Sequence, residues 1–168
     1  MGGAKYDLSL LFTYACVDHY LCNGGKLGFV ITQTVFKTKG SGAGFRRFQF
    51  ERRGDGATGK VFLSVRNVHD MSDFQPFEGA TNKTATFVLE RKDVPMATEG
   101  REARLPVKYP VSYTAWRKVP GKSIAPEMSL SQVRKAVKRV EMGAVPVDRQ
   151  KITSPWLTAS KKIIDNGI

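Results

Sequence analysis

The chain has 168 residues, of which 27 are Lys or Arg and 15 are Asp or Glu, so its formal net charge is +12 and its pI is about 9.9. This length fits one domain, or one domain and part of another. With 41% hydrophobic residues the chain has enough apolar material for a core, which excludes a chain that is disordered by composition. It contains neither a secretory signal nor the run of about 18 apolar residues that a membrane span needs. We therefore expect a basic cytosolic protein without a membrane segment.

The cysteines and histidines of the chain do not form a motif. Cys16 and Cys22 have no Cys or His partner at a metal-ligand spacing, which argues against a disulfide framework and against a zinc site, and we expect both to be small core residues. His19 and His69 have no Ser, Cys or carboxylate at the spacing of a catalytic triad, although Asp70 directly follows His69. Structural or surface roles are expected for both histidines, and no metal site is predicted.

The first 32 residues have the pattern of a helix followed by a strand. Apolar residues recur at helical offsets from Leu8 to Leu21, and Asp7 stands before them as a possible N-cap. A glycine turn at residues 23–25 ends this helix. The next seven residues, from Lys26 to Thr32, are apolar and β-branched, which predicts a buried strand. Helix, glycine turn and buried strand together indicate an α/β protein in which helices cover a sheet.

The middle of the chain alternates between turns and expected strands. We predict a mobile glycine loop at residues 40–44, since its glycines match no phosphate-binding motif, and a short helix at residues 45–51. Residues 54–59 read as a surface turn, and residues 61–71 and 84–90 as strands. Between these strands lies an aromatic-bearing loop without a regular pattern, which indicates a functional segment. The polar stretch at residues 93–105 suits a domain boundary.

The last 68 residues hold most of the net charge, with fourteen basic side chains and five acidic ones. Ser129 and Gln132 have the spacing of a capping box, and we expect the helix that they begin to run to Gly143. Its apolar stripe would be Leu130, Val133, Val137 and Val140. The basic residues Arg134, Lys135, Lys138 and Arg139 would lie mainly on its other face. These four side chains would either contact nucleic-acid phosphates or form an ordinary solvated face.

A resemblance takes the interpretation further. The segments that carry it, in order, are Tyr6-Asp-Leu-Ser-Leu-Leu-Phe12, Asn23-Gly-Gly-Lys-Leu-Gly-Phe-Val-Ile31, Val35-Phe-Lys-Thr-Lys39, Phe45-Arg-Arg-Phe48, Asp73-Phe-Gln-Pro-Phe77 and Thr84 to Arg91. In this order and spacing, residues 6–92 resemble the adenine-specific DNA methyltransferases of bacterial restriction-modification and phage-defence systems. In that family an Asp-Leu-x-x-x-Phe helix, a Gly-Gly-x-Leu-x-Phe-Ile strand and an Arg-x-x-Phe helix follow the catalytic loop. The strand from Thr84 is similar to the family's reversed hairpin strand.

The resemblance implies a fold, an activity and a cofactor. The fold would be α/β, the C-terminal half of a Rossmann-like methyltransferase sheet at residues 1–93, followed at 94–168 by a basic, partly helical linker and the start of a target-recognition region. The activity would be methyl transfer from S-adenosylmethionine to the exocyclic amine of adenine in DNA, in the cytoplasm of a bacterium or archaeon. The family's cofactor loop and its Asn-Pro-Pro-aromatic motif are absent from the chain. We therefore expect a fragment or split subunit, inactive alone, that needs an N-terminal remainder or a complementing chain.

The resemblance also implies site residues. Phe77, or alternatively Phe74, would stack on the adenine after it leaves the base stack, and the other interpretation of both is ordinary core packing. Asp7 and Leu8 would lie near the adenine end of the cofactor. Residues from Tyr109 onward would begin to contact DNA. Two alternatives stay open: a non-catalytic basic α/β subunit that binds DNA or RNA, and a methyltransferase that acts on RNA or protein.

Overall fold

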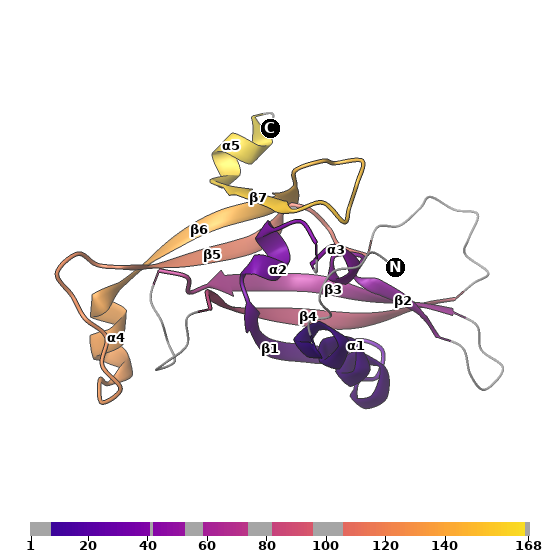
Figure 1. Ribbon diagram of the computed structural model, residues 1–168, viewed down its shortest axis with the longest axis horizontal. Coiled ribbons are helices and arrows are strands. Elements are labelled where there is room, and N and C mark those ends of the chain that lie inside the picture. The colour runs from indigo at the N-terminus through magenta and orange to yellow at the C-terminus, as the bar shows by residue number, and fades with distance from the viewer. Residues whose placement is uncertain (1–7, 41, 53–58, 74–81, 96–105, 167–168) are drawn as a thin grey trace.

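The computed structural model describes residues 8–40, 42–52, 59–73, 82–95 and 106–166. These residues form a mixed α/β structure, in which a seven-stranded sheet carries a few short helices (Figure 1). The elements in chain order are α1 (Leu8–Tyr20), β1 (Lys26–Thr32), α2 (Thr34–Lys37), α3 (Gly42–Phe45), β2 (Gln49–Arg52), β3 (Gly59–Asp70), β4 (Thr84–Pro95), β5 (Val111–Lys118), α4 (Leu130–Ala136), β6 (Val137–Pro146), β7 (Trp156–Ala159) and α5 (Lys161–Asp165).

The strands follow the order β1-β4-β3-β5-β6-β7, and β2 pairs with β3 outside this path. β4 is antiparallel to both of its neighbours, β1 and β3, while β5 is parallel to β3. β1, β3 and β5 therefore run in one direction, and their ends at Thr32, Asp70 and Lys118 point toward the same side of the sheet. We call this side the carboxyl edge. The two segments that the sequence divides at Asp93 share this sheet, and Asp93 itself lies within β4.

The core lies between one face of the sheet and the helices α1 to α3. Phe87 of β4 stands at its centre, with ring centroids 6.2, 6.1 and 5.8 Å from those of Phe29, Phe36 and Phe45. Trp156 of β7 stacks on Phe36 with the ring centroids 4.9 Å apart. We call this side the helix-covered face. The aromatic contacts join the first strands and the last strand of the sheet in one core.

The predicted helix and strand at the start of the chain are confirmed as α1 and β1. The expectation that β1 is a buried strand is wrong, since its side chains alternate in exposure and Val30 is 49% exposed. The reason is its place in the sheet: within the described residues β1 pairs only with β4, so it is an edge strand. Cys22 is exposed rather than in the core, and Cys16 is half-buried; both are free thiols.

The helix expected at residues 45–51 is wrong, because α3 ends at Phe45 and β2 begins at Gln49. Between them Phe48 has a φ of 50°, a left-handed conformation that stops a helix. The expected mobile loop is also wrong at Gly42, where a Cβ atom would lie 2.2 Å from the carbonyl oxygen of Val35. This glycine permits close backbone packing between α2 and α3.

Arg46 ties three segments of the fold together although its side chain is fully buried. Its guanidinium donates hydrogen bonds to the carbonyl oxygens of Val35, Thr38 (2.9 Å) and Thr153 (3.0 Å). Burial lowers its pKa to about 10. Because these carbonyls belong to α2, its C-terminal end and the segment before β7, Arg46 supplies the donors that hold α2 against the last strand.

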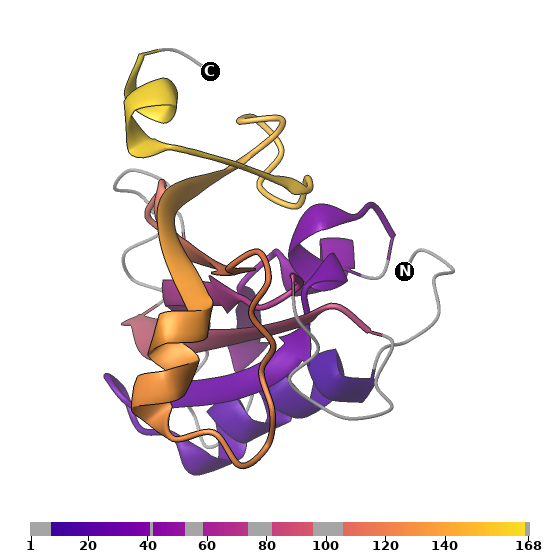
Figure 2. The ribbon, with the colours of Figure 1, turned by 90° about the vertical axis from the view of Figure 1, so that its left-hand side faces the viewer.

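The capping box at Ser129 and Gln132 is confirmed, but the helix that it starts is wrong in length. α4 ends at Ala136, and Gly143 lies inside β6 rather than at a helix end. β6 pairs antiparallel with β5 along its length, whereas β5 pairs with β3 only through Ala115. From Trp116 to Val140 the chain therefore forms a two-stranded projection that carries α4. We call residues 116–140 the arm, which extends past the carboxyl edge (Figures 1 and 2).

Candidate functional site

Polar side chains from four elements meet at the carboxyl edge. Gln33 directly follows β1, Asp70 is the last residue of β3, Tyr113 lies in β5, and Lys37 ends α2. They come together because parallel strands bring their carboxyl ends to one side of a sheet. In open α/β sheets, ligands bind outside these strand ends. The cluster is therefore our candidate site.

Asp70 is the centre of this cluster and is 7% exposed. One carboxylate oxygen accepts hydrogen bonds from the Tyr113 hydroxyl (2.6 Å) and the Gln33 amide (3.3 Å), and the other accepts from the backbone N–H (2.9 Å) and the hydroxyl of Ser72. Burial alone would raise the pKa of Asp70, but these donors outweigh it and lower the pKa below its ordinary value. A carboxylate with four donors is a positioning group and not a free general base.

Lys37 is the cation of this polar cluster. Its Nζ donates a hydrogen bond to the Thr158 hydroxyl of β7 and lies 4.9 Å from the centroid of the Tyr113 ring. Burial lowers the pKa of Lys37 to about 8; Asp70 acts in the opposite direction and Arg117 in the same direction. The ammonium group is thus held by β5 and β7 together, at a position where it loses part of its hydration.

The arm adds further positive charge next to Lys37. Arg117 lies 3.6 Å from the carboxylate of Asp73, which also accepts a hydrogen bond of 2.8 Å from the backbone N–H of Lys118. In the register of β5 and β6, Arg117 stands directly opposite Lys138. Since side chains alternate along a strand, both point to the helix-covered face, as Tyr113 does. Two cations therefore face each other on the side of the arm nearest Lys37.

The opposite face of the arm is different. Trp116 donates a hydrogen bond of 3.2 Å to Nδ1 of His69, and Arg139, which stands opposite Trp116, pairs with Glu141 at 2.7 Å. Burial, and then the charge of Arg139, lower the pKa of His69. His69 thus has a packing partner and no catalytic neighbour among the groups that the structure describes around it.

Taken together, the groups at the carboxyl edge are suited to bind an anion. Lys37 and Arg117 offer N–H donors, whereas the oxygens of Asp70 already accept hydrogen bonds. Within the described ranges, no group of His, Cys, Asp and Glu could hold a metal ion. The arrangement thus offers donors to an anion and, at Asp70, a carboxylate whose oxygens are already hydrogen-bonded.

The structure separates the residues that the sequence grouped on one helix face. Arg134 and Lys135 lie on α4, whereas Lys138 and Arg139 lie on β6 and point to opposite faces. The expectation that these residues share one helix face is therefore wrong, because the chain from Val137 onward pairs with β5 instead of continuing the helix.

Other expected site residues are placed apart or are not placed. Leu8 begins α1 and is 77% exposed. Asp7, Phe74 and Phe77 lie outside the described residues. Sequence reasoning missed Gln33, Lys37 and Tyr113, although a polar residue directly after a predicted strand was an available signal for Gln33.

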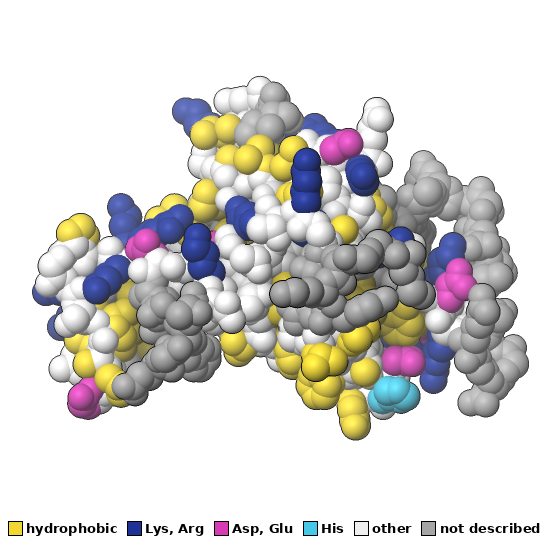
Figure 3. Space-filling model, viewed as in Figure 1, with side chains coloured by type: hydrophobic (Ala, Val, Ile, Leu, Met, Phe, Trp, Pro, Cys, Tyr) yellow, Lys and Arg dark blue, Asp and Glu magenta, His cyan; other side chains and the backbone are white. Residues whose placement is uncertain are grey.

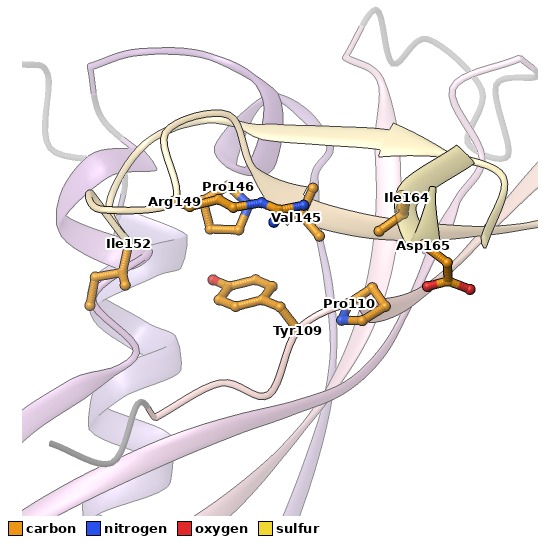
Figure 4. Close-up of a pocket in the computed structure, with 8 residues that line it drawn as sticks. All are labelled: Tyr109, Pro110, Val145, Pro146, Arg149, Ile152, Ile164 and Asp165. Carbon is orange, nitrogen blue, oxygen red and sulfur yellow. The ribbon is translucent and has the colours of Figure 1, made fainter. Parts of the chain in front are cut away.

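A pocket of about 370 Å³ lies between the start of β5, the β6–β7 connection and α5 (Figure 4). Its lining is mostly apolar, with Arg149 and Asp165 as the charged members, and the Tyr109 ring lies in its middle. Burial raises the pKa of Tyr109 to about 12. Its hydroxyl has no hydrogen-bond partner among the described residues.

Comparison with known proteins adds no relative. No family model matches the chain. No curated protein matches it either. Of the described helices, none has the length and apolar character that crossing a membrane requires.

Proposed function

We propose that the chain is the C-terminal half of a Rossmann-like adenine DNA methyltransferase, with the start of its target-recognition region. The completed enzyme transfers a methyl group from S-adenosylmethionine to the exocyclic amine of adenine in DNA, in the cytoplasm of a bacterium or archaeon. In this proposal residues 1–93 are the methyltransferase part, and residues 94–168, whose strands continue the same sheet, approach DNA.

The observation that carries this proposal is the reversed strand β4. It lies between β1 and β3, which run in the same direction, and is antiparallel to both. The resemblance led us to expect a reversed hairpin strand from Thr84 to Arg91, and β4 covers that segment. A strand inserted against the direction of two parallel neighbours is a specific arrangement, since such neighbours are otherwise joined by direct crossovers.

The position of the polar cluster agrees with the proposal. Asp70 and Lys37 lie at the carboxyl edge, and the segment with Phe74 and Phe77 follows Asp73 directly in the sequence. A flipped adenine is held by stacking on an aromatic ring. We assign this role to Phe77, with Phe74 as the alternative, and a weak contact to the cofactor's adenine end to Asp7 and Leu8. Arg134, Lys135 and Lys138 would contact DNA phosphates, whereas Arg139, the fourth residue expected to do so, pairs with Glu141 on the opposite face of the arm.

The surface around β1 and α1 fits the part that the chain lacks. Apolar side chains are exposed on α1, with Leu11 54% and Phe12 57% exposed, although Leu10 and Val17 on its other side are buried. A helix that is apolar all round is normally buried on both sides. Beside it, β1 offers unpaired backbone groups within the described part of the sheet. We assign this surface to the half that carries the cofactor loop and the Asn-Pro-Pro-aromatic motif.

This exposed surface should make the isolated chain self-associate. Changing Leu11 and Phe12 together to Lys removes two apolar side chains from α1 and adds charge, so we expect the sedimentation coefficient to fall toward that of a monomer. Sedimentation velocity at several protein concentrations measures it. The matched control is Ile163→Lys, which changes a side chain that is 53% exposed on α5 and should leave association unchanged. Association that is unaltered in the double variant would contradict the assignment.

Complementation tests the function itself. The chain is co-expressed with an N-terminal methyltransferase half that carries the cofactor loop, and transfer of tritiated methyl from S-adenosylmethionine to duplex DNA is measured. Transfer to unmethylated DNA, but not to DNA already methylated at adenine N6, is the expected result. The chain alone should neither transfer methyl groups nor bind the cofactor tightly in isothermal titration. Tight cofactor binding by the chain alone, or no transfer after complementation, would refute the proposal.

The basic arm favours a second candidate, a non-catalytic subunit that binds nucleic acid. Residues 117–139 contain seven Lys or Arg and one acidic residue. Such a subunit would bind DNA or RNA without any effect of a complementing half. A methyltransferase that acts on RNA or protein would instead transfer label to those substrates in the same assay.

A further inference from the structure

Three cations from different parts of the chain lie on the same side of the carboxyl edge. They are Lys37 at the end of α2, Arg117 of β5 and Lys138 of β6. We propose that these three side chains bind a backbone phosphate of DNA at the carboxyl edge. The inference rests on the proposed function only in its choice of DNA as the polyanion, since binding can be measured without methyl transfer.

The first argument is the cross-strand pair. Arg117 and Lys138 are directly opposite in the β5–β6 register. Like charges at such positions destabilise a sheet, because the two Cβ atoms are only about 5 Å apart. The nearby carboxylate, Asp73, lies 3.6 Å from Arg117 and does not contact Lys138 in an ion pair. An arrangement that costs stability in the free protein is expected where an external anion relieves it.

The second argument is the environment of Lys37. Its side chain is half-buried, and only one of its N–H donors has a hydrogen-bond acceptor, the Thr158 hydroxyl, among the described residues. The carboxylate whose charge acts on Lys37, Asp70, already accepts four hydrogen bonds and makes no ion pair with Lys37. Burial and the charge of Arg117 both oppose the ammonium form. A phosphate oxygen would supply the acceptor and the negative charge that this position lacks.

The third argument is continuity with the arm. Beyond Arg117, the side chains of Lys118, Lys122, Arg134 and Lys135 are exposed and make no ion pair with any described residue. Figure 3 shows Lys and Arg side chains gathered over the arm, beside the carboxyl edge. By contrast Arg139 points to the opposite face and is paired with Glu141. A DNA strand that follows the arm would thus reach Lys37 at its end, close to the polar cluster.

The test is DNA binding by the full 168-residue chain, measured by fluorescence anisotropy with a labelled duplex over a range of salt concentrations. For Lys37→Gln we expect affinity to fall about tenfold, as for one lost charge-assisted contact, and the slope of log affinity against log salt to flatten by about 0.9. Lys37→Arg should retain the slope. Lys138→Gln should flatten it by the same amount, at an exposed position where folding is not at risk.

The matched control is Lys92→Gln, which removes the same charge from an exposed position near the opposite edge of the sheet. It should leave both affinity and slope within error of the unmodified chain. If Lys37→Gln and Lys138→Gln behave like this control, the phosphate site is refuted. If they flatten the slope although complementation yields no methyl transfer, the phosphate site stands and the proposed function fails.

A pH series separates Lys37 from the rest of the arm. As pH rises from about 7 to about 9.5, Lys37 loses its proton in the free chain, so its contact with phosphate weakens. Of the groups that face it, Tyr113 has a raised pKa and Asp70 a lowered one, Thr158 does not ionise, and Arg117 is the other cation. Affinity should fall several-fold in the unmodified chain and stay level in Lys37→Arg. An equal fall in both would refute the role of Lys37.

Discussion

Replacing Arg46 by Met should lower the free energy of unfolding by about 3 to 5 kcal/mol, the range of changes that break a buried hydrogen-bond network. Met keeps most of the side-chain volume but supplies no donor. The carbonyl oxygens of Val35, Thr38 and Thr153 would then lose their side-chain partner in the interior. Each buried acceptor left unsatisfied costs about 1 to 3 kcal/mol. Urea unfolding followed by tryptophan fluorescence measures the change, since Trp156 lies in the core.

Arg47→Met is the matched control for this prediction. Arg47 is the next residue in the chain, carries the same charge and is exposed. Its replacement should change the free energy of unfolding by less than about 0.5 kcal/mol, as is usual for surface positions. Equal effects of the two substitutions would mean that net charge, and not the buried hydrogen bonds of Arg46, sets the stability.

The second large effect is expected at Asp70. Asp70→Asn should cost about 2 to 4 kcal/mol at neutral pH, because an amide offers one acceptor oxygen and places an NH₂ group against the donors of Gln33, Tyr113 or the Ser72 backbone. Asp73→Asn is the comparison: it removes a half-exposed carboxylate three residues away, where an ion pair contributes about 0 to 1 kcal/mol.

The cost of Asp70→Asn should depend on pH in a defined direction. The pKa of Asp70 is lower in the folded protein than its ordinary value of 3.8, so the unfolded chain binds the proton more tightly. The carboxylate therefore stabilises the fold at every pH above about 4, and this contribution disappears as the pH falls through the lowered pKa. The difference between the unmodified chain and Asp70→Asn should be constant between about pH 5 and 8 and smaller near pH 3. A difference that grows in acid would contradict the hydrogen-bond account.

Local signals in the sequence were sufficient for several elements. The strand at Lys26–Thr32 is bounded by a glycine turn and is rich in β-branched residues, so no distant contact was needed to predict it. The start of α4 followed from the reciprocal bonds of Ser129 and Gln132, which involve only neighbouring residues. Where a turn or a cap decides the structure, the sequence could be interpreted directly.

Long-range pairing explains the elements that could not be predicted. Leu130, Val133, Val137 and Val140 fit one face of a helix by spacing, yet the last two belong to β6. The sequence around Val137 does not indicate that this residue pairs with Lys118 of β5. The helix expected at residues 45–51 failed for the same reason, because β2 forms only by pairing with β3.

The candidate site was even less visible in the sequence. Gln33, Asp70, Tyr113 and Thr158 are spread over most of the chain and form no spacing motif. In the sequence Asp70 stands out only as the neighbour of His69, whereas its hydrogen-bond partners are Gln33 after β1, Tyr113 of β5 and Ser72. Only the strand order brings them together. That order includes the parallel pair β3–β5, which no local sequence pattern predicts.

Arg91 fixes α1 to the sheet by hydrogen bonds, so the exposed apolar side of this helix is held in place by more than packing. The Arg91 guanidinium is 2% exposed and donates hydrogen bonds to the carbonyl oxygens of Val17, Asp18 and Leu21, at the C-terminal end of α1. Asp93 holds the same guanidinium at 2.7 Å. The helix is thereby fastened to the reversed strand β4 at the end where helices otherwise fray.

In the proposed enzyme, the complementing half would thus meet a surface of this chain that is already ordered. If α1 became ordered only on binding, the entropy lost in ordering it would weaken the association. Because α1 is already ordered in the free chain, binding does not include this loss. In the proposed assembly this chain would dock without a folding step of its own, and about 10⁵ to 10⁷ M⁻¹ s⁻¹ is the usual range for such association. Assembly of the proposed split sheet would then be a bimolecular association whose rate depends on the concentrations of the two halves.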